Sequence, residues 1–318
     1  MKWITHHGCT QENQSPGPTV VALGCFDGLH IAHKAIVSRA VLATREHGGI
    51  PTIFTFDASS SVGGKQTPLL MDNASRFRRM REWGIEQIYY PPFSAVRDIP
   101  AEAFVREVLA GCCRAKMALC GFNFHFGKGG QADAGELQRL GAQQGIEVEV
   151  IPEILQGGQA VSSTRVRRCV QEGRMEEAAA LLGHPFSLVF PVEHGRKLGR
   201  RLGFPTANQT IPASFIRPRF GVYVSQTRLD GRWYYGITNV GVKPTVGSDR
   251  VVAETWFPDV QIDVYGQSLE IYLETFLREE RKFQGLDALQ EQIRQDHKQA
   301  VAWLRGRQDC PENLPVTK

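Results

Sequence analysis

Short apolar runs and helical patterns alternate along the first half of the chain. The apolar runs that predict β-strands lie at residues 20–23, 52–56, 87–90, 117–120 and 146–151. Between them, apolar residues recur with helical spacing at residues 32–46, 76–83, 101–110 and 135–144. Strand–helix alternation at this spacing predicts an α/β domain with a mainly parallel sheet.

The pattern changes after residue 183. Two helical patterns at residues 164–171 and 175–182 close the first half, and Gly183-His184-Pro185 marks a boundary. Short alternating strands separated by Gly/Pro turns follow, and they predict a small antiparallel β-barrel; they include residues 222–228, 233–240, 251–256 and 269–276. A final amphipathic helix is predicted at residues 286–304. We therefore expect one domain at residues 1–183, a second at 184–305 and a polar tail at 306–318.

Composition favours two globular domains and is compatible with anionic substrates. The 318 residues are 42% hydrophobic and 22% charged, which is typical of chains that form ordinary apolar cores. The net charge of +4 is compatible with anionic ligands but is too small to argue for nucleic-acid binding.

The cysteines and the apolar runs predict a cytoplasmic location. The seven cysteines include no CxxC pair, and an odd number does not indicate a disulfide framework. Cys112 and Cys113 lie in an apolar helical segment, where we expect buried free thiols in a reducing cytoplasm. The opening residues lack a signal pattern, and no apolar run approaches the roughly 18 residues of a membrane span.

A first candidate site lies where residues 24–28 lead from a strand into a helix that carries His30 and His33. A glycine-flanked turn of this kind presents backbone N–H groups and a positive dipole end to an anion. Imidazoles at positions i and i+3 share a helical face and can donate hydrogen bonds to phosphate oxygens. The alternative is that the two histidines only cap the helix or pack against it.

Two further loops belong with this candidate site. Residues 121–130 form a glycine-rich turn after the fourth predicted strand, and hydroxyl residues at 162–164 precede Arg165 and Arg167 at the start of a helix. Ligands collect at the carboxyl ends of parallel strands, so we expect the three loops to converge.

A second candidate site is the segment Gly203-Phe204-Pro205-Thr206-Ala207-Asn208, which follows a basic run at residues 195–201. In an extended chain, Thr206 and Asn208 point to the same side. Their neutral oxygens suit Mg²⁺, which takes much of its charge compensation from substrate phosphates. A basic turn with a polar cap is the alternative.

This segment resembles the signature of the riboflavin kinase module of prokaryotic bifunctional riboflavin kinase/FAD synthetases. Further matches follow in order at residues 221–223, 238–245, 254–255, 263–266 and 278–283. The three loops of the first half resemble the adenylyltransferase module of the same family, whose fold is that of the HxGH nucleotidyltransferases. The chain departs from that module at Ala32 in place of glycine, Cys25 in place of asparagine, Asn123 in place of aspartate, and residues 56–60, which lack a Pro-His-Pro.

The resemblance implies a role for each matching residue. Glu254 would be the general base of the kinase, with Thr206 and Asn208 binding Mg²⁺. Arg278 and Asn123 would contact the flavin, although an ion pair between Arg278 and Glu274 is an alternative. His30 and His33 would act on the phosphates during adenylyl transfer. The other ATP- and phosphate-binding residues would be Gly24, Phe26, Asp27, Gly28, Ser162, Ser163, Thr164, Arg167 and Gly203.

Two consecutive reactions follow from the resemblance. Riboflavin and ATP would give FMN and ADP, and FMN and ATP would then give FAD and pyrophosphate, with no nucleic acid or membrane as partner. An alternative is a riboflavin kinase whose adenylyltransferase domain is degenerate. Other possibilities are a nucleic-acid-binding protein that uses residues 165–168 and 196–201, and a module that binds flavin without transferring phosphate. The oligomeric state is not predicted.

Overall fold

The computed structural model describes residues 2–4, 14–57, 67–194, 204–245, 248–258, 260 and 264–307; at 2–4, 244–245 and 248–249 it describes the backbone only. It divides into two compact units, Met1–Ser163 and Thr164–Lys318. This division lies before the domain boundary expected at residue 183, and the domain limits stay a prediction. Within the described ranges, no helix is both long enough and apolar enough to cross a membrane.

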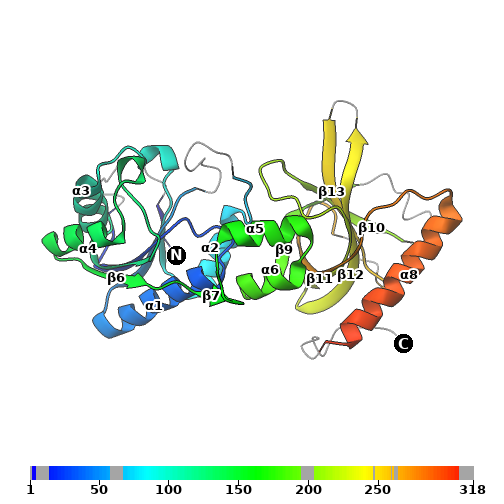
Figure 1. Ribbon diagram of the computed structural model, residues 1–318, viewed down its shortest axis with the longest axis horizontal. Coiled ribbons are helices and arrows are strands. Elements are labelled where there is room, and N and C mark those ends of the chain that lie inside the picture. Colours follow the sequence, from blue (N-terminus) through cyan, green and yellow to red (C-terminus); the bar gives the residue numbers. More distant parts are fainter. Residues whose placement is uncertain are drawn as a thin grey trace. The chain divides into compact units, whose positions relative to one another are not determined.

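The first unit is built around a parallel sheet with the strand order β1-β4-β3-β2-β5-β6, as predicted (Figure 1). Only β1 has no counterpart among the predicted strands, because three residues are too few to show an alternating pattern. The strands are β1 (Lys2–Ile4), β2 (Thr19–Leu23), β3 (Ile50–Phe54), β4 (Gln87–Tyr89), β5 (Ala115–Gly121) and β6 (Glu147–Ile151).

Helices cover both faces of this sheet. Val20 and Ala22 pack into a core with α1 (Ile31–His47) and α2 (Asn73–Glu82). Val21 and Leu23 point to the opposite face, into a core with the other helices of the unit. Strands buried on both faces explain the continuous apolar runs in the sequence. The helices of the opposite face are α3 (Ala101–Ala103), the π-helix η4 (Phe104–Cys112) and α4 (Ala134–Gln143).

Short elements complete the first unit. They are two 3₁₀ turns, η3 (Phe93–Ala95) and η5 (Lys128–Gly130), and a hairpin formed by β7 (Leu155–Gln156) and β8 (Gln159–Ala160). The cysteine prediction is half correct. Cys113 is a buried free thiol, whereas Cys112 is disulfide-bonded, which no sequence spacing signals.

The second unit contains a closed six-stranded antiparallel barrel with the order β10-β13-β12-β11-β14-β9, which confirms the predicted barrel. A long C-terminal helix, α8 (Leu286–Arg305), follows it as predicted. Helices α5 (Ser163–Glu172) and α6 (Met175–Leu182) precede the barrel. The barrel strands are β9 (Phe186–Glu193), β10 (Thr206–Ile211), β11 (Gly221–Leu229), β12 (Arg232–Thr245), β13 (Ser248–Trp256) and β14 (Ser268–Arg278).

Side chains alternate between the inside and the outside of the barrel. The hydroxyls of Ser225, Thr238 and Thr255 form a fully buried hydrogen-bonded chain with oxygen–oxygen distances of 2.7 and 2.8 Å. Helix α8 packs on the outer surface, where Ala300 and Leu304 join an apolar cluster with residues of β11 and β12. Because Thr255 points inward, its neighbour Glu254 lies on the outer face.

Candidate active sites

The first unit contains a cavity of about 930 Å³ at the carboxyl ends of its central strands. Gly24 lines it just after β2, Gly121 at the end of β5 with Asn123 beyond it, and Ser162 and Ser163 at the start of α5. The three loops expected to converge therefore do so. Thr164 and Arg167 follow Ser163 in α5 and belong to the second unit.

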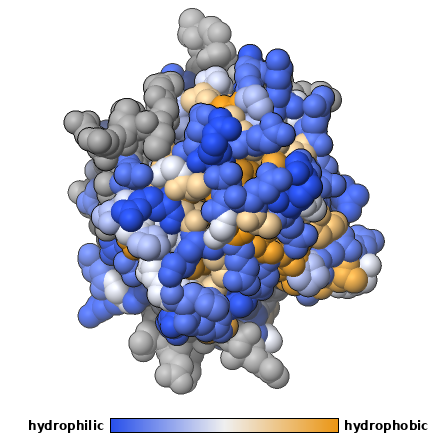
Figure 2. All heavy atoms as spheres, turned by 90° about the vertical axis from the view of Figure 1, so that its left-hand side faces the viewer, coloured by the Kyte–Doolittle hydropathy of each residue, from blue (hydrophilic) through white to orange (hydrophobic). Residues whose placement is uncertain are grey.

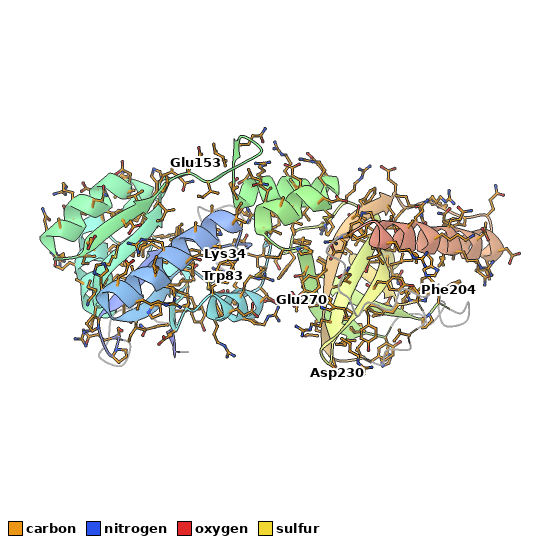
Figure 3. All side chains as sticks on the ribbon, turned by 90° about the horizontal axis from the view of Figure 1, so that it is seen from below. Lys34, Trp83, Glu153, Phe204, Asp230 and Glu270 are labelled. Atoms are coloured by element: carbon orange, nitrogen blue, oxygen red, sulfur yellow. The ribbon has the colours of Figure 1, made fainter. Side chains whose placement is uncertain are left out.

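His30 and His33 both line this cavity, but they do not share a helical face. His30 is the N-cap of α1, with extended backbone angles (φ −67°, ψ 171°). Its Nδ1 accepts a hydrogen bond from the backbone N–H of His33 at 3.3 Å, and the two rings stack with centroids 3.6 Å apart. The prediction of a shared helical face was wrong, because the capping bond holds His30 outside the helix. Lys34, labelled in Figure 3, continues α1 directly after His33.

Burial keeps both imidazoles uncharged near neutral pH. It lowers the pKa of His30 from 6.5 to about 4. The pKa of His33 is also well below its usual value, first because of burial and then because of the charges of His30 and Arg76. His33 Nδ1 is buried and has no hydrogen-bond partner in the described part of the chain. The pair can therefore offer neutral N–H donors to a phosphate, but not fixed positive charges.

Three residues of the turn after β2 shape the loop and do not belong to the cavity lining. Phe26 is fully buried, with its ring centroid 5.1 Å from that of His33. The carboxylate of Asp27 accepts the backbone N–H of Leu70 at 3.2 Å, and its carbonyl accepts the Ser163 hydroxyl at 2.8 Å. Gly28 has φ +78°, and a Cβ there would lie 2.6 Å from Leu70 Cδ1. Their ATP-binding role stays a prediction; their observed contacts hold the loop and the Ser163 segment together.

Arg76 on α2 was missed by the sequence analysis, although its guanidinium organises two of the strand ends. The side chain is buried, and its Nη2 donates to the Cys25 carbonyl at 2.6 Å and to the Thr55 hydroxyl at 2.7 Å. Its Nη1 donates to the Phe56 carbonyl at 3.1 Å. The available signal was its position four residues before the buried Met80, on the apolar side of the helix.

Aromatic rings form much of the remaining cavity wall. Phe54 and Phe104 meet edge to face with centroids 5.4 Å apart, and Phe56 and Phe93 do so at 5.0 Å. Such rings offer a flat apolar surface beside the polar loops. Spacing along the sequence gave no signal for this wall, because its members come from separate elements. The face shown in Figure 2 is largely hydrophilic, with hydrophobic residues exposed between polar ones.

The second candidate site lies on the outer face of the barrel. Across the β10–β13 pair, Asn208 stands opposite Glu254 and Thr206 opposite Trp256, so the four side chains share one face. Asn208 Nδ2 donates to Thr206 Oγ1 at 3.2 Å. Lys243 Nζ donates to Asn208 Oδ1 at 3.2 Å and forms an ion pair with Glu254. Strand register thus brings the predicted base and the predicted metal ligands into one group.

The donor set of this group fits Mg²⁺. Thr206 and Asn208 offer two neutral oxygens beside one carboxylate, and Asn208 Oδ1 already faces a cationic group, the ammonium of Lys243. In the described ranges, no cluster of three or more His, Cys, Asp or Glu side chains is placed to hold a metal ion. A magnesium ion bound here would therefore take its remaining ligands from phosphate oxygens and water. Gly203 and the basic run at 195–201 lie outside the described residues.

Arg278 is held by α8. Its Nε and Nη2 donate to the two carboxylate oxygens of Asp296 at 2.8 and 2.7 Å, and Gln292 donates to the same carboxylate at 2.7 Å. The ion pair considered between Arg278 and Glu274 is absent among the described side chains, because Glu274 pairs with Arg307. Sequence reasoning missed Asp296, which is distant along the chain.

Aromatic side chains lie beside Glu254 on the same outer face. The Trp256 ring meets Phe204, labelled in Figure 3, edge to face with centroids 4.9 Å apart. It also meets His297 of α8 at 5.5 Å, and His297 Nε2 is hydrogen-bonded to the Tyr235 hydroxyl at 2.9 Å. The polar group around Glu254 is thus bordered by an apolar, planar surface.

Known proteins match both units. The FAD synthetase family model matches residues 12–165, and the riboflavin kinase model matches residues 182–304. A solved structure described as a macrolide-efflux protein from Streptococcus pneumoniae superposes with a TM-score of 0.85 and 27% identity, covering 95% of this chain and 100% of that chain. That description refers to the solved protein.

Curated relatives match over almost the full length. The chain is 30% identical to the bifunctional riboflavin kinase/FMN adenylyltransferase of Listeria monocytogenes, over 96% of this chain and 98% of that protein. It is 31% identical to the Bacillus subtilis protein of the same name, over 95% and 97% of the two chains. The Pseudomonas fluorescens protein of that name is 32% identical, over 92% and 91%. The chain therefore belongs to the family of bifunctional riboflavin kinase/FMN adenylyltransferases.

Proposed function

We propose that this chain phosphorylates riboflavin to FMN in its barrel unit and adenylylates FMN to FAD in its parallel-sheet unit. The observation that carries the kinase assignment is the hydrogen-bonded group of Thr206, Asn208, Lys243 and Glu254 on one barrel face. The adenylyltransferase assignment is supported by the convergence of three loops on one cavity that includes both histidines.

In the kinase reaction, Glu254 accepts the proton of the ribityl 5′-hydroxyl while that oxygen attacks the γ-phosphorus of ATP and ADP leaves. The ion pair with Lys243 uses one carboxylate oxygen, so the other is available for the proton. Thr206 and Asn208 would hold Mg²⁺, which neutralises phosphate charge when bound. Alignment and charge stabilisation supply most of the acceleration in phosphoryl transfer.

In the adenylyl transfer, a phosphate oxygen of FMN attacks the α-phosphorus of ATP and pyrophosphate leaves, with no covalent enzyme intermediate. Neutral His30 and His33 donate hydrogen bonds to phosphate oxygens as charge builds up. The N-terminus of α1 and the hydroxyls of Ser162 and Ser163 face the same cavity and favour an anion there.

The flavin contacts and the cellular location are further parts of the proposal. Asn123 lies on the cavity wall close to the aromatic rings, which suits a flavin ring in the adenylyl-transfer site. Arg278 would contact riboflavin through its exposed edge while Asp296 fixes its orientation. A cytoplasmic location agrees with the use of ATP as substrate in both steps.

Chromatography of the products formed from riboflavin, ATP and Mg²⁺ tests the proposal. We expect FMN to appear first and FAD to accumulate after it. FMN without FAD would favour the alternative in which only the kinase is active, since Ala32 and the replaced residues 56–60 alter the adenylyl-transfer loops. A reaction that formed neither FMN nor FAD would contradict both assignments.

A further inference from the structure

Lys243 stands at the centre of the proposed kinase site, although neither reaction step above assigns it a role of its own. It lies on β12, and its side chain is 36% exposed. Its ammonium contacts the side chains of Asn208 and Glu254 and no other group in the described chain. These partners are the proposed metal ligand and the proposed base.

Each of the two contacts engages an oxygen atom of a residue that the proposed kinase reaction uses. A carboxamide has one acceptor atom, and in Asn208 that atom, Oδ1, accepts from Lys243 while Nδ2 donates to Thr206. In Glu254, the ammonium takes Oε1, and the carboxylate makes no other hydrogen bond to the described residues. The lysine therefore leaves one carboxylate oxygen open and engages the oxygen that a divalent cation would use.

We propose that Lys243 is a positioning residue of the kinase site, which fixes the Glu254 carboxylate for proton acceptance and competes with Mg²⁺ for the Asn208 carboxamide oxygen. This inference rests on the proposed riboflavin kinase activity. If Mg²⁺ bound there with ATP, the ammonium would give up Asn208 and keep Glu254.

The two roles predict opposite effects when the positive charge is removed. A neutral residue no longer repels the divalent cation at a distance of a few ångströms, so metal binding strengthens. The same change frees the Glu254 carboxylate to rotate, and a misplaced base slows the proton transfer. A lysine that only stabilised the barrel would weaken both properties together.

The primary experiment measures FMN formation by the full-length protein as a function of Mg²⁺ concentration. For Lys243→Met we expect kcat to fall at least about tenfold and the half-saturating Mg²⁺ concentration to fall about threefold or more. Lys243→Arg keeps a cation at the site and should recover part of kcat without the tighter metal binding. Lys298→Met, at an exposed position on α8, is the matched control and should behave as the parent.

A second readout is independent of turnover. Mn²⁺ is titrated into the full-length protein with ADP, and free Mn²⁺ is followed by electron paramagnetic resonance. The part of the binding that Asn208→Ala abolishes belongs to the kinase site, which separates it from binding in the first unit. We expect this part to be tighter in Lys243→Met than in the parent.

The outcomes separate this inference from the proposed function. If the parent forms no FMN, the kinase assignment itself fails. If the parent forms FMN and Lys243→Met keeps its kcat, or loses kcat with unchanged or weaker metal binding, Lys243 does not have the proposed role. Circular dichroism of each variant identifies loss of folding; if Lys243→Met is unfolded, Lys243→Gln replaces it in the same two measurements.

Discussion

At the scale of single residues, each candidate site contains a polar side chain that a neighbour holds in one orientation. His30 is fixed by the N–H at the start of α1, and Glu254 by the ammonium of Lys243. Burial keeps His30 neutral, so its ring can offer a hydrogen-bond donor without the cost of hiding a charge. Orientation and protonation state, more than the number of charges, define each site.

The histidine pair predicts how stability depends on pH. Between about pH 6.5 and 4, the unfolded chain protonates histidines that stay neutral in the fold, so the unfolding free energy falls as the pH is lowered through this window. His30→Asn keeps a capping oxygen but removes one titrating group, and should reduce that fall by roughly 3 kcal/mol. Urea denaturation at several pH values measures this change in the unfolding free energy. His47→Asn, at a half-exposed side chain, is the control; equal pH dependence in parent and His30→Asn would contradict the burial argument.

Sequence patterns predicted the residues that act within one element and missed those that act across elements. Thr206 and Asn208 were placed on a shared face because the period of a strand is two. Glu254 could be connected to them only through the resemblance, since strand register is not visible in one sequence. Lys243 and Asp296 gave no local signal, and Arg76 gave only its position on the apolar side of α2, because each finds its partners on a different element.

At the scale of elements, α8 and the register of the barrel strands determine the second site. The β10–β13 pairing sets Asn208 opposite Glu254, and β12 adds Lys243 on the other side of β13. Helix α8 covers the outer barrel face with an apolar cluster and holds Arg278 at the end of β14 through Asp296. The site is therefore sensitive to changes in helix docking and in strand pairing.

Arg278 connects stability with the proposed flavin contact. Arg278→Leu leaves the Asp296 carboxylate, only 2% exposed, without its ionic partner and should cost about 3–5 kcal/mol of unfolding free energy. Adding Asp296→Leu removes the unpaired charge and should restore most of that loss. The riboflavin KM should stay raised in the double variant if Arg278 also contacts the flavin. A double variant with normal KM would limit Arg278 to a structural role.

Gly221 begins β11 at a place where only glycine fits. Its φ is +148°, and a Cβ there would overlap the carbonyl oxygen of Arg278 and lie 2.6 Å from Phe276 Cε2. Gly221→Ala should therefore separate β11 from β14 and destabilise the protein by about 3 kcal/mol or more. Gly266→Ala is the control, since Gly266 also has a positive φ but no atom of the described residues within 4 Å of the added Cβ; it should cost about 1 kcal/mol. Similar urea midpoints for the two variants would contradict the steric argument.

At the scale of the whole molecule, each compact unit has its own core and its own candidate site. Strand–helix alternation predicted the parallel sheet, because strands buried on both faces are apolar throughout. Short alternating strands with Gly/Pro turns predicted the barrel, because a strand buried on one face alternates apolar and polar residues. The closing order of the barrel strands and the short strand β1 could not be predicted, since they depend on pairing between distant segments. The cavity was expected from three loops, but its aromatic wall was not.

Product chromatography with two single variants tests most directly whether the two units carry separate activities. Given riboflavin, ATP and Mg²⁺, Glu254→Gln should form no FMN, yet should convert supplied FMN to FAD at the rate of the parent. His30→Asn should form FMN normally and convert at least about tenfold less of it to FAD. Loss of FMN formation in His30→Asn, or loss of FAD formation from supplied FMN in Glu254→Gln, would contradict the assignment of one reaction to each unit.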